Sequence, residues 1–505
     1  MTQAPDWAGT DRLLLHGCRV MGMPGASAVL LEADRIAWVG DDPKAVRADR
    51  VIDMQGALLA PGFVDAHVHA TSTGLSLIGL DLTAAADADA VLALIAEAAS
   101  GADALIGHGW DETRWAQGRM PSRAQIDRAA GGAIAYLSRI DVHSALVSTA
   151  LLDLVPGIEA MDGFTFDGPL SRAAHHAVRE VAQQQVARER RADAQRAMRS
   201  HAAAVGIVAM QEMAGPVISS PDDLRALLAL ARAEPGPLVQ GYWGELAQHG
   251  GIDRARELGA VGVGGDLFID GSIGSRTACL RAPYRDEPAS RGAQYLTIDE
   301  VVAHVHAATI AGMQAGFHVI GDAATDVIVD AFLDVADAVG METFRARRHR
   351  LEHAELLDDR HLAALGSLGV TVSMQPMFDR LWGGGDGMYE RRLGPDRMRG
   401  MNRFASILGA GIPMAFGSDA PVTPLGPWAA VDAAVRHHQP GERIDEQAAF
   451  AAHTRAAWRA IGCDDAGVIA PGAQAHLVAW SDDTPPRALC TIVAGRVVHD
   501  SGELS

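Results

Sequence analysis

Lysine is almost absent from this chain of 505 residues, and Lys44 is the only one. No mechanism that needs a lysine in the middle of the chain is therefore possible. Cysteine is also scarce, because Cys18, Cys279, Cys463 and Cys490 are the only four and no two of them form a CxxC pair. A scaffold held together by disulfides is excluded on that ground.

Long apolar runs and excess positive charge are missing as well. No stretch of about 18 apolar residues is uninterrupted, so we expect no membrane-spanning segment. The 63 acidic residues outnumber the 43 basic ones and give a formal net charge of −20, which argues against a nucleic acid or an anionic membrane as partner. The first twelve residues carry Asp6 and Asp11 and lack an apolar core, so we expect no signal peptide and a cytoplasmic location. A small-molecule substrate is the expected partner, and a homodimer is the default oligomer.

The composition is that of a folded enzyme-sized chain. Hydrophobic residues make up 48% of it and charged residues 21%, with 54 glycines and 23 prolines, which excludes a disordered chain. The length exceeds one core of ordinary size and suffices for a barrel of about 250 residues with additional layers.

Both ends of the chain read as short β-strands. Apolar runs at 13–20, 28–32 and 35–39 and a run ending near residue 58 are separated by Gly, Pro or Asp turns. The tail has similar runs at 475–480 and 491–498. Because an isolated N-terminal sheet would leave its edges unpaired, we expect residues 1–58 and 468–505 to form one composite β-sandwich domain.

The middle of the chain alternates between strand-like and helix-like segments, which predicts an α/β fold. Repeated βα units over residues 59–467 indicate a (β/α)8 TIM barrel. The expected barrel strands after the first are 206–210, 238–242, 267–269, 314–319, 350–353, 370–375 and 413–417, with helices at 222–233, 298–311 and 325–339.

An α/β insertion is expected after the first barrel strand, at about residues 80–200. It contains its own strand-like runs at 104–107 and 133–137 and a long Arg-, Gln- and Ala-rich helix at about 171–204. The charges of that helix are interpreted as a solvated face rather than a binding site.

Two histidines mark the end of the first barrel strand. Within 63–69, His67 and His69 lie two residues apart, so their side chains point to the same face of a strand. Two imidazoles at the C-terminal end of a barrel strand form a ready metal clamp. Such a pair also occurs by chance, but the Pro61-Gly62 break before it places it at the start of the barrel.

Three more polar residues end apolar runs further along the chain. His318 follows 315–317, His353 follows 350–352, and Asp419 follows 415–418. Each alone reads as an ordinary hydrogen-bonded residue. Together with the first pair they place four histidines and a carboxylate at strand ends, where barrel enzymes carry their chemistry.

Taken together, these motifs resemble the amidohydrolase superfamily, and within it the YtcJ-like (amidohydrolase 3) proteins related to N-substituted formamide deformylases. The segments that carry the resemblance are PGFVDAHVH (61–69), RIDVHSA (139–145), DGSIGSRTA (270–278), FHVIGDAA (317–324), RLEHAE (350–355), GSDAPV (417–422) and GVIAPGAQAHLV (467–478). The resemblance implies a metal-dependent barrel with a composite β-sandwich that hydrolyses amide or other C–N bonds.

The resemblance also implies roles for individual residues. It makes metal ligands of His67, His69, His318 and His353, and it makes Asp419 a carboxylate at the metal that also shuttles protons. A metal lowers the pKa of bound water towards about 7, and a nearby carboxylate can move the proton to the leaving nitrogen. If His353 is not a ligand, it is expected to act as a catalytic partner that polarises the scissile carbonyl.

One departure from the family pattern concerns the number of ions. Many superfamily members bridge two metals through a carboxylated lysine after strand four, where this chain has Asp266. With Lys44 in the sheet domain, no such lysine exists, so the site is either mononuclear or bridged by Asp266 or Glu212. One divalent ion is the favoured alternative, and the nitrogen and oxygen ligand set suits zinc, although iron or manganese would fit.

Four residues are candidates for substrate binding, namely His143, Trp110, Asp270 and Arg276. His143 resembles a pocket-lining position, or else it is a buried, hydrogen-bonded histidine. Arg276, in a glycine-rich loop after strand four, could clamp an oxygen of the substrate or pair with Asp270. Trp110 is a candidate for an apolar wall. Glu352 is expected to face the helix layer and pair with Arg350, because adjacent strand residues point to opposite sides.

These expectations lead to one leading function and two alternatives. The leading one is metal-dependent hydrolysis of an amide or other non-peptide C–N bond of a small molecule. The alternatives are a mononuclear-metal deaminase of a heterocycle and a non-catalytic, metal-stabilised binding protein. The position of Asp419 beside four histidines argues against the last, because a scaffold needs no proton shuttle. The fold does not identify the substrate.

Overall fold

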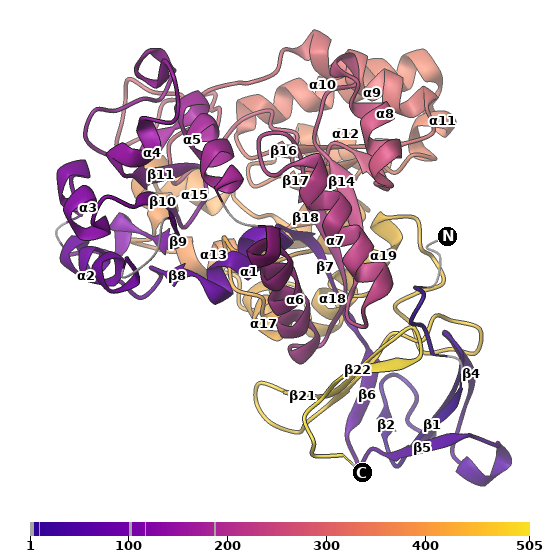
Figure 1. Cartoon of the computed structure of the whole chain (residues 1–505). Helices are drawn as coiled ribbons and strands as arrows, with labels where there is room; N and C mark the ends of the chain where they lie inside the picture. Colours follow the sequence, from indigo (N-terminus) through magenta and orange to yellow (C-terminus); the bar gives the residue numbers. More distant parts are fainter. Residues whose placement is uncertain (1–4, 10, 100–103, 117, 186–187, 505) are drawn as a thin grey trace.

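The computed structural model describes residues 5–9, 11–99, 104–116, 118–185 and 188–504. Three parts are visible in Figure 1. A barrel occupies the centre, a smaller α/β part with β8 to β11 packs on one side of it, and a sheet domain built from both ends of the chain lies below. The predicted fold class, a (β/α)8 barrel with an additional sheet domain and an insertion, is confirmed.

The barrel sheet has eight parallel strands in the order of the chain. These strands are β7 (Phe63–Val68), β13 (Ile207–Ala214), β14 (Leu238–Trp243), β15 (Gly262–Val263), β16 (Gln314–Val319), β17 (Arg350–His353), β18 (Thr371–Met374) and β19 (Met414–Phe416). A bridge between Val68 and Ala420 joins the first strand to the segment after the last. The amide of Asp419 donates to the carbonyl of His67 at 2.8 Å beside that bridge, so closure of the barrel places these two residues side by side.

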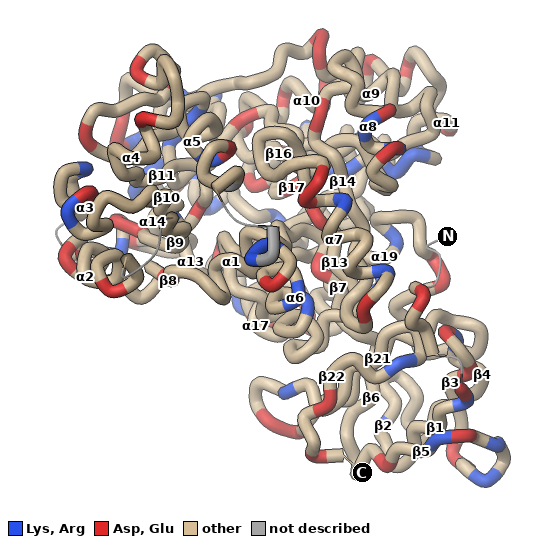
Figure 2. Tube along the Cα trace, viewed as in Figure 1, with Lys and Arg blue, Asp and Glu red and all other residues tan. Residues whose placement is uncertain are grey.

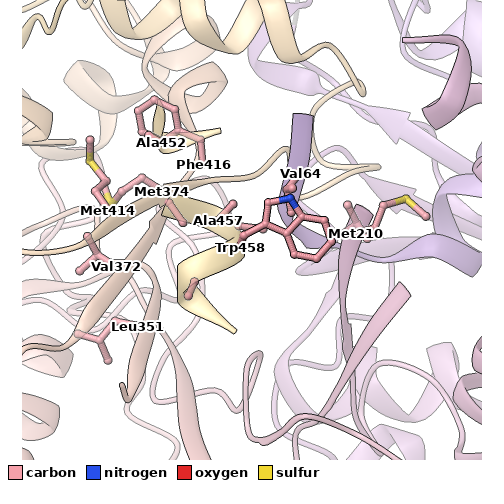
Figure 3. Packing of buried hydrophobic residues seen from close by; sticks show 14 of the residues in the cluster. Val64, Met210, Leu351, Val372, Met374, Met414, Phe416, Ala452, Ala457 and Trp458 are labelled. Atoms are coloured by element: carbon pink, nitrogen blue, oxygen red, sulfur yellow. The ribbon is translucent and has the colours of Figure 1, made fainter. Parts of the chain in front are cut away.

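The barrel strands are buried on both faces because helices cover the outside. Every residue of β7 is buried, as expected of a parallel strand inside an α/β fold. Figure 3 shows Trp458 of α19 (Arg455–Ala460) close to Val64 of β7 and Met210 of β13. These residues belong to one buried cluster that includes Val372 of β18.

The helices around the barrel begin at recognisable caps. Thr297 and Glu300 form a reciprocal capping box at the start of α9, and Ser220 caps α7, whose first residue is a proline. Besides α19, the helices of this layer are α1 (Ala70–Ile78), α6 (Arg188–Ala204), α7 (Pro221–Ala233), α8 (Gly251–Leu258), α9 (Ile298–Ile310), α10 (Asp322–Val339), α11 (Met341–Arg345), α12 (Asp359–Leu368), α13 (Pro376–Trp382), α14 (Met388–Leu393), α15 (Pro395–Arg399), α16 (Phe404–Gly409), α17 (Pro427–Val435) and α18 (Glu446–Ala452).

The fourth barrel strand differs from the prediction. The sequence suggested a strand at 267–269, but the strand is β15, and only a single bridge from Phe268 to His318 continues the pairing. Gly264 and Gly265 interrupt it with φ angles of +114° and +79°, a region that favours glycine. A Cβ atom on Gly264 would lie 2.0 Å from the carbonyl oxygen of Gly316. The break positions the next residue, Asp266, at the mouth of the barrel.

The insertion forms a five-stranded sheet of its own. Its strands lie in the order β8 (Leu80–Asp81), β9 (Ala104–Trp110), β10 (Ile134–Arg139), β11 (Ser144–Val147) and β12 (Leu170–Ser171). Its helices are α2 (Ala88–Ala98), α3 (Arg123–Ala130), α4 (Thr149–Leu152) and α5 (Arg172–Gln184). The predicted single helix at 171–204 is two helices, α5 and α6; residues 186–187 of the predicted helix lie outside the described residues.

Two sheets that share one hydrophobic cluster form the additional domain. One has the order β4-β3-β1-β5 and comes from the N-terminal segment; the other, β2-β6-β20-β21-β22, adds the tail, because β20 pairs antiparallel with β6. Their strands are β1 (Arg12–His16), β2 (Arg19–Val20), β3 (Ala28–Glu32), β4 (Arg35–Gly40), β5 (Arg50–Asp53), β6 (Leu58–Pro61), β20 (Leu477–Trp480), β21 (Ala488–Val493) and β22 (Arg496–Asp500). Short 3-10 helices lie at Pro43–Ala45, Glu112–Arg114, Ile158–Ala160, Ala247–His249 and Pro440–Glu442.

Charged residues are spread over all three parts. Figure 2 shows acidic and basic residues interspersed along the trace of the barrel helices and of the insertion. Among the described residues, no helix is both long enough and apolar enough to cross a membrane.

Candidate metal centre

Four histidines and two carboxylates meet at the C-terminal mouth of the barrel. Each is no more than 6% exposed. They come from the ends of β7, β15, β16, β17 and β19, which converge there because all eight strands run parallel. The residues are His67, His69, Asp266, His318, His353 and Asp419.

Asp419 lies against the first histidine pair. Its Oδ1 atom is 3.3 Å from Nε2 of His67 and 3.2 Å from Nε2 of His69. Strand alternation in β7 points both imidazoles to this face. Three ligand atoms from two segments far apart in the chain therefore share one small space.

The carboxylate of Asp266 lies between the two halves of the cluster. Its Oδ2 is 3.3 Å from Nε2 of His69 and 3.7 Å from Nε2 of His67. Its Oδ1 is 3.2 Å from Nδ1 of His318 and 3.6 Å from Nε2 of His353. Each carboxylate oxygen therefore faces a different pair of imidazoles.

The far sides of three rings are held by hydrogen-bond acceptors. Nδ1 of His67 lies 2.8 Å from Oε2 of Glu352, Nδ1 of His69 lies 3.0 Å from the carbonyl of Met213, and Nδ1 of His353 lies 2.8 Å from Oε1 of Gln375. An acceptor at Nδ1 places the proton of a neutral imidazole there and leaves Nε2 with a lone pair.

His318 is turned the other way round. Its Nε2 lies 3.2 Å from the carbonyl of Gly271, and its Nδ1 faces Asp266. The same reasoning assigns the proton to Nε2 and the lone pair to Nδ1. All four imidazoles consequently direct a lone pair towards the two carboxylates, which is the arrangement of metal ligands with fixed tautomers.

The position of Glu352 corrects the expectation from strand alternation. Glu352 is fully buried inside the barrel, where it contacts both His67 and Arg350, instead of facing the helix layer. The pairing of Glu352 with Arg350 was expected, and Nε of Arg350 lies 2.5 Å from Oε1 of Glu352. His353 has a φ angle of 68°, so the backbone leaves the extended conformation there. The side chains of Glu352 and His353, although adjacent in sequence, therefore both reach the interior.

The residues present fit a divalent metal ion. Nε2 of His67 and Oδ1 of Asp419 are buried and complete no hydrogen bond, although buried polar atoms normally do. The edges of a tetrahedral zinc site with metal–ligand distances of about 2.1 Å measure about 3.4 Å. The separations of 3.2–3.7 Å between nitrogen and oxygen atoms around the two carboxylates match such edges.

The electrostatics show how strongly these groups are coupled. Burial alone would lower the pKa of His69, but Asp266 and Asp419 reverse the effect and raise it to about 9, so that a proton on Nε2 competes with a metal ion for the lone pair. Burial raises the pKa of Asp419, yet the positive charge of His67 outweighs it and holds that pKa below its usual range. A carboxylate that stays ionised among imidazoles is suited to ligate a cation.

The structure does not bring Glu212 into the cluster. Its Oε2 accepts a hydrogen bond of 2.6 Å from the backbone amide of Ala70, at the start of α1. Burial raises the pKa of Glu212 to about 7, although His69 partly opposes the shift. Of the two carboxylates considered as alternatives to a lysine, only Asp266 faces both pairs of histidines, one with each oxygen.

The sequence made Asp270, Arg276 and Trp110 candidates for substrate contact, but the structure gives all three side chains partners within the protein. Asp270 is fully buried, and its carboxylate accepts backbone hydrogen bonds from Cys279, Ile320 and Gly321. The carboxylate therefore holds the loop after β15 against the end of β16.

Arg276 pairs with a residue ten positions further on. Its Nη2 lies 2.9 Å from Oδ2 of Asp286, on the partly exposed side of the loop. It contacts neither Asp270 nor the histidine cluster. Trp110 is fully buried in the core of the insertion, and its Nε1 donates to the carbonyl of Leu137.

His143 does lie beside the cluster. Its ring centroid is 5.2 Å from that of His318 and 5.6 Å from that of Phe268. It lines a small cavity of about 30 Å³ that also reaches His353 and Asp419. The apolar side of this cavity is formed by Ile273, Ile320, Phe378, Trp382, Met388 and Val422. Burial lowers the pKa of His143 to about 3, and His318 adds to the shift.

Two residues at the site were missed by sequence reasoning. Gln375 follows β18 directly and orients His353; its place at a C-terminal strand end was a usable signal. His108 of the insertion lies with Nε2 2.8 Å from the carbonyl of Pro421, two residues after Asp419. No local pattern marks that second contact, because it depends on how the insertion docks.

Comparisons with known proteins agree with this geometry. The model of the amidohydrolase family matches residues 50–499. Putative amidohydrolase YtcJ of Bacillus subtilis is 28% identical over 78% of this chain and 77% of its own length. N-substituted formamide deformylase of Arthrobacter pascens is 23% identical over 80% of each chain, and protein LONG AFTER FAR-RED 3 of Arabidopsis thaliana is 27% identical over 94% of this chain and 89% of its own.

A solved structure of a metal-dependent hydrolase has a similar fold. An uncharacterised metal-dependent hydrolase from Pyrococcus furiosus superposes with a TM-score of 0.72 and 26% identity, over 92% of this chain and 98% of its own. The family match spans most of the sequence and includes every residue of the candidate metal centre. The chain therefore belongs to the amidohydrolase family of hydrolases.

Proposed function

We propose that this protein hydrolyses an amide or other non-peptide C–N bond of a small molecule at a metal centre in the mouth of the barrel. The observation that carries the proposal is the convergence of four oriented imidazole lone pairs on Asp266 and Asp419. Membership of the amidohydrolase family supports it, as does the name of the formamide deformylase to which the chain is similar.

A first ion would be held by His67, His69 and Asp419, with Oδ2 of Asp266 facing the same space. The nitrogen and oxygen donors suit zinc, and iron or manganese would fit the same set. The lone-pair directions follow from hydrogen bonds on the far sides of the rings, so the ligands are positioned before an ion enters.

The geometry bears on the number of ions. The sequence favours one ion, and that prediction remains untested. Oδ1 of Asp266 faces His318 and His353 while Oδ2 faces the other pair, which favours a second half-site bridged by this carboxylate. We therefore include a second ion in the proposal. If only one ion binds, His353 is left to polarise the scissile carbonyl as a hydrogen-bond donor.

The metal, when bound, would lower the pKa of a water molecule and polarise the carbonyl of the substrate. Asp419 has the position and charge to accept the proton of the attacking water, because its carboxylate is buried and ionised. It would then deliver that proton to the leaving nitrogen. The apolar side of the cavity beside His353 and Asp419 would limit the access of bulk water to this transfer.

The test uses the holoenzyme and a panel of formamides, N-acyl compounds, lactams and a cyclic amidine. We expect metal-dependent release of an amine or acid from at least one amide, with loss of turnover on chelation and recovery on adding the metal back. The variant Asp419→Asn, assayed with enough added metal to saturate the site, should lose about 10²- to 10⁴-fold in kcat. Full turnover by that variant would contradict the shuttle role. Turnover of the amidine alone would favour the deaminase.

A further inference from the structure

Arg179 is a buried arginine without an anionic partner in the described part of the chain. It lies on α5 and is 9% exposed. Among the described residues its Nε atom has no hydrogen-bond partner, and none of their carboxylates lies within ion-pair distance of its guanidinium. Buried charges in proteins are normally paired, because their desolvation is costly. An unpaired one indicates that its partner comes from outside the protein.

The position of Arg179 on its helix is that of a core residue. The buried positions of α5 include Ala174, Val178 and Ala182, which follow a helical repeat, and Arg179 lies next to this stripe. The sequence suggested that the charges of this segment face solvent. Arg179 departs from this expectation, because its helix turns it towards the barrel mouth instead.

The guanidinium lines a cavity that reaches the metal centre. This cavity of about 60 Å³ is lined by Arg179, His69, His108, Tyr136 and Ser138, among others. A larger cavity of about 240 Å³ shares His69 and Ile218 with it. A ligand in this space can therefore contact Arg179 at one end and the side of His69 at the other.

The acidic residues next to Arg179 in sequence or on the wall of the larger cavity have other partners. Glu180 is exposed and accepts from Gln184. Glu212 accepts from the backbone amide of Ala70, and Asp223 accepts from the side chain of Gln195. Each is accounted for without Arg179.

The two histidines beside Arg179 on α5 add no negative charge. His175 and His176 are its neighbours on α5, and burial first, then the charge of Arg179, lowers the pKa of both; that of His176 falls to about 3. These imidazoles are therefore neutral. The cavity is positively charged at this end, which favours an anion.

We propose that Arg179 binds a carboxylate of the substrate, so that the natural substrate is an amide that carries a carboxylate. A planar guanidinium presents two parallel N–H donors, which match the two oxygens of a carboxylate. The proposal rests on the proposed function for the position of the scissile bond. The anion site itself depends only on Arg179 and its cavity.

The test compares ligand pairs that differ only in the carboxylate. N-formylglycine is paired with N-ethylformamide, N-acetylglycine with N-ethylacetamide, and succinamate with butyramide. Binding to the holoenzyme is measured by calorimetry, and kcat/KM is measured for every pair that is turned over. We expect the wild-type protein to prefer the acidic member of at least one pair by about 10- to 100-fold.

Three variants assign that preference to Arg179. Arg179→Gln should abolish it, and Arg179→Lys, which keeps the charge but not the planar fork, should retain only part of it. Arg128→Gln, on an exposed position of α3 in the same insertion, should bind like the wild type. If Arg179→Gln does not fold, a reduced preference in Arg179→Lys is the supporting result. An unchanged preference in Arg179→Lys and Arg179→Gln, or no preference in the wild type, would overturn the proposal.

The outcomes separate this proposal from the proposed function. Carboxylate binding that needs Arg179, without hydrolysis of any amide, would leave the anion site standing and refute the amidase. Hydrolysis of neutral and acidic amides with equal efficiency by wild type and Arg179→Gln would support the amidase and refute the anion site. A loss of thermal stability in Arg179→Gln without a change in the acidic preference would assign Arg179 a structural role only and overturn the anion site.

Discussion

Nδ1 of His67 lies 2.8 Å from Oε2 of Glu352, while Nε2 of the same ring lies 3.3 Å from Oδ1 of Asp419. The histidine is thus held between a carboxylate that fixes its tautomer and one that faces the same space as its lone pair. Arg350 contacts both oxygens of Glu352, with its Nε at 2.5 Å from Oε1 and its Nη2 at 3.1 Å from Oε2. A buried ion pair in the barrel interior therefore determines the direction of a candidate metal ligand.

The first prediction concerns Glu352→Gln. The amide can still contact His67, but it neither attracts the Nδ1 proton as strongly nor balances Arg350. We expect metal affinity to fall by about 10- to 100-fold, because partners that orient a ligating histidine contribute that much. Competition with a chromogenic chelator measures the change.

The neighbouring carboxyl group provides the matched control. Glu355 lines the cavity that reaches His353 and Asp419, but no imidazole Nδ1 of the cluster is hydrogen-bonded to it. Glu355→Gln should keep the metal affinity of the wild type. Equal affinities in all three proteins would show that Glu352 serves only to balance Arg350.

The second prediction concerns the turn that positions Asp266. Gly264→Ala places a Cβ atom 2.0 Å from the carbonyl oxygen of Gly316, at a φ of +114°. Gly250→Ala is the control, because its φ of +91° is also unfavourable but no atom lies within 4 Å of the added Cβ. We expect Gly250→Ala to cost about 1–3 kcal/mol, and Gly264→Ala to cost more and to weaken metal binding. Thermal unfolding and metal content provide the two measurements, and similar losses at both positions would contradict the steric argument.

The third prediction concerns acid stability. Burial lowers the pKa of His349 to about 3, and His304 adds to the shift, whereas an unfolded histidine titrates near about 6.5. Between these values the unfolded chain binds more protons, so the stability from this group is complete above pH about 6.5 and is lost as the pH falls towards 3. Each pH unit within the window changes the free energy of unfolding by up to about 1.4 kcal/mol.

The variant His349→Asn tests the predicted loss of stability at low pH. Asn can still accept the hydrogen bond that Ala315 donates to Nδ1, but it does not titrate. Its free energy of unfolding should fall less steeply from pH 6 to pH 4 than that of the wild type, as followed by denaturant titration. His306→Asn, on an exposed position of α9, should leave the slope unchanged. A slope in His349→Asn equal to the wild type would show that His349 titrates normally.

Much of the centre could be predicted from the sequence because it depends on local rules. Alternation in β7 placed His67 and His69 on one face, and the ends of parallel strands placed His318, His353 and Asp419 at the same mouth. These rules concern residues within a strand or the common direction of strands, and both are encoded in short segments.

The failures have physical causes outside such rules. Glu352 was assigned to the wrong side because His353 leaves the extended conformation, which a sequence pattern does not show. Arg276 forms an ion pair with Asp286, and Trp110 is buried in the hydrophobic core of the insertion. Arg179 was overlooked because its helix was expected to face solvent, and only the docking of the insertion shows that it lines a cavity.

Metal analysis of protein purified without added metal tests the central claim most directly. The account predicts at least one equivalent of a divalent transition metal per chain in the wild type and in His306→Ala, and its loss in a folded His67→Ala variant. Two equivalents, with one lost in His318→Ala, would support the bridging role of Asp266. A metal-free wild-type protein that gains no ion on dialysis against zinc, or a His67→Ala variant that binds the same metal as tightly, would contradict the account.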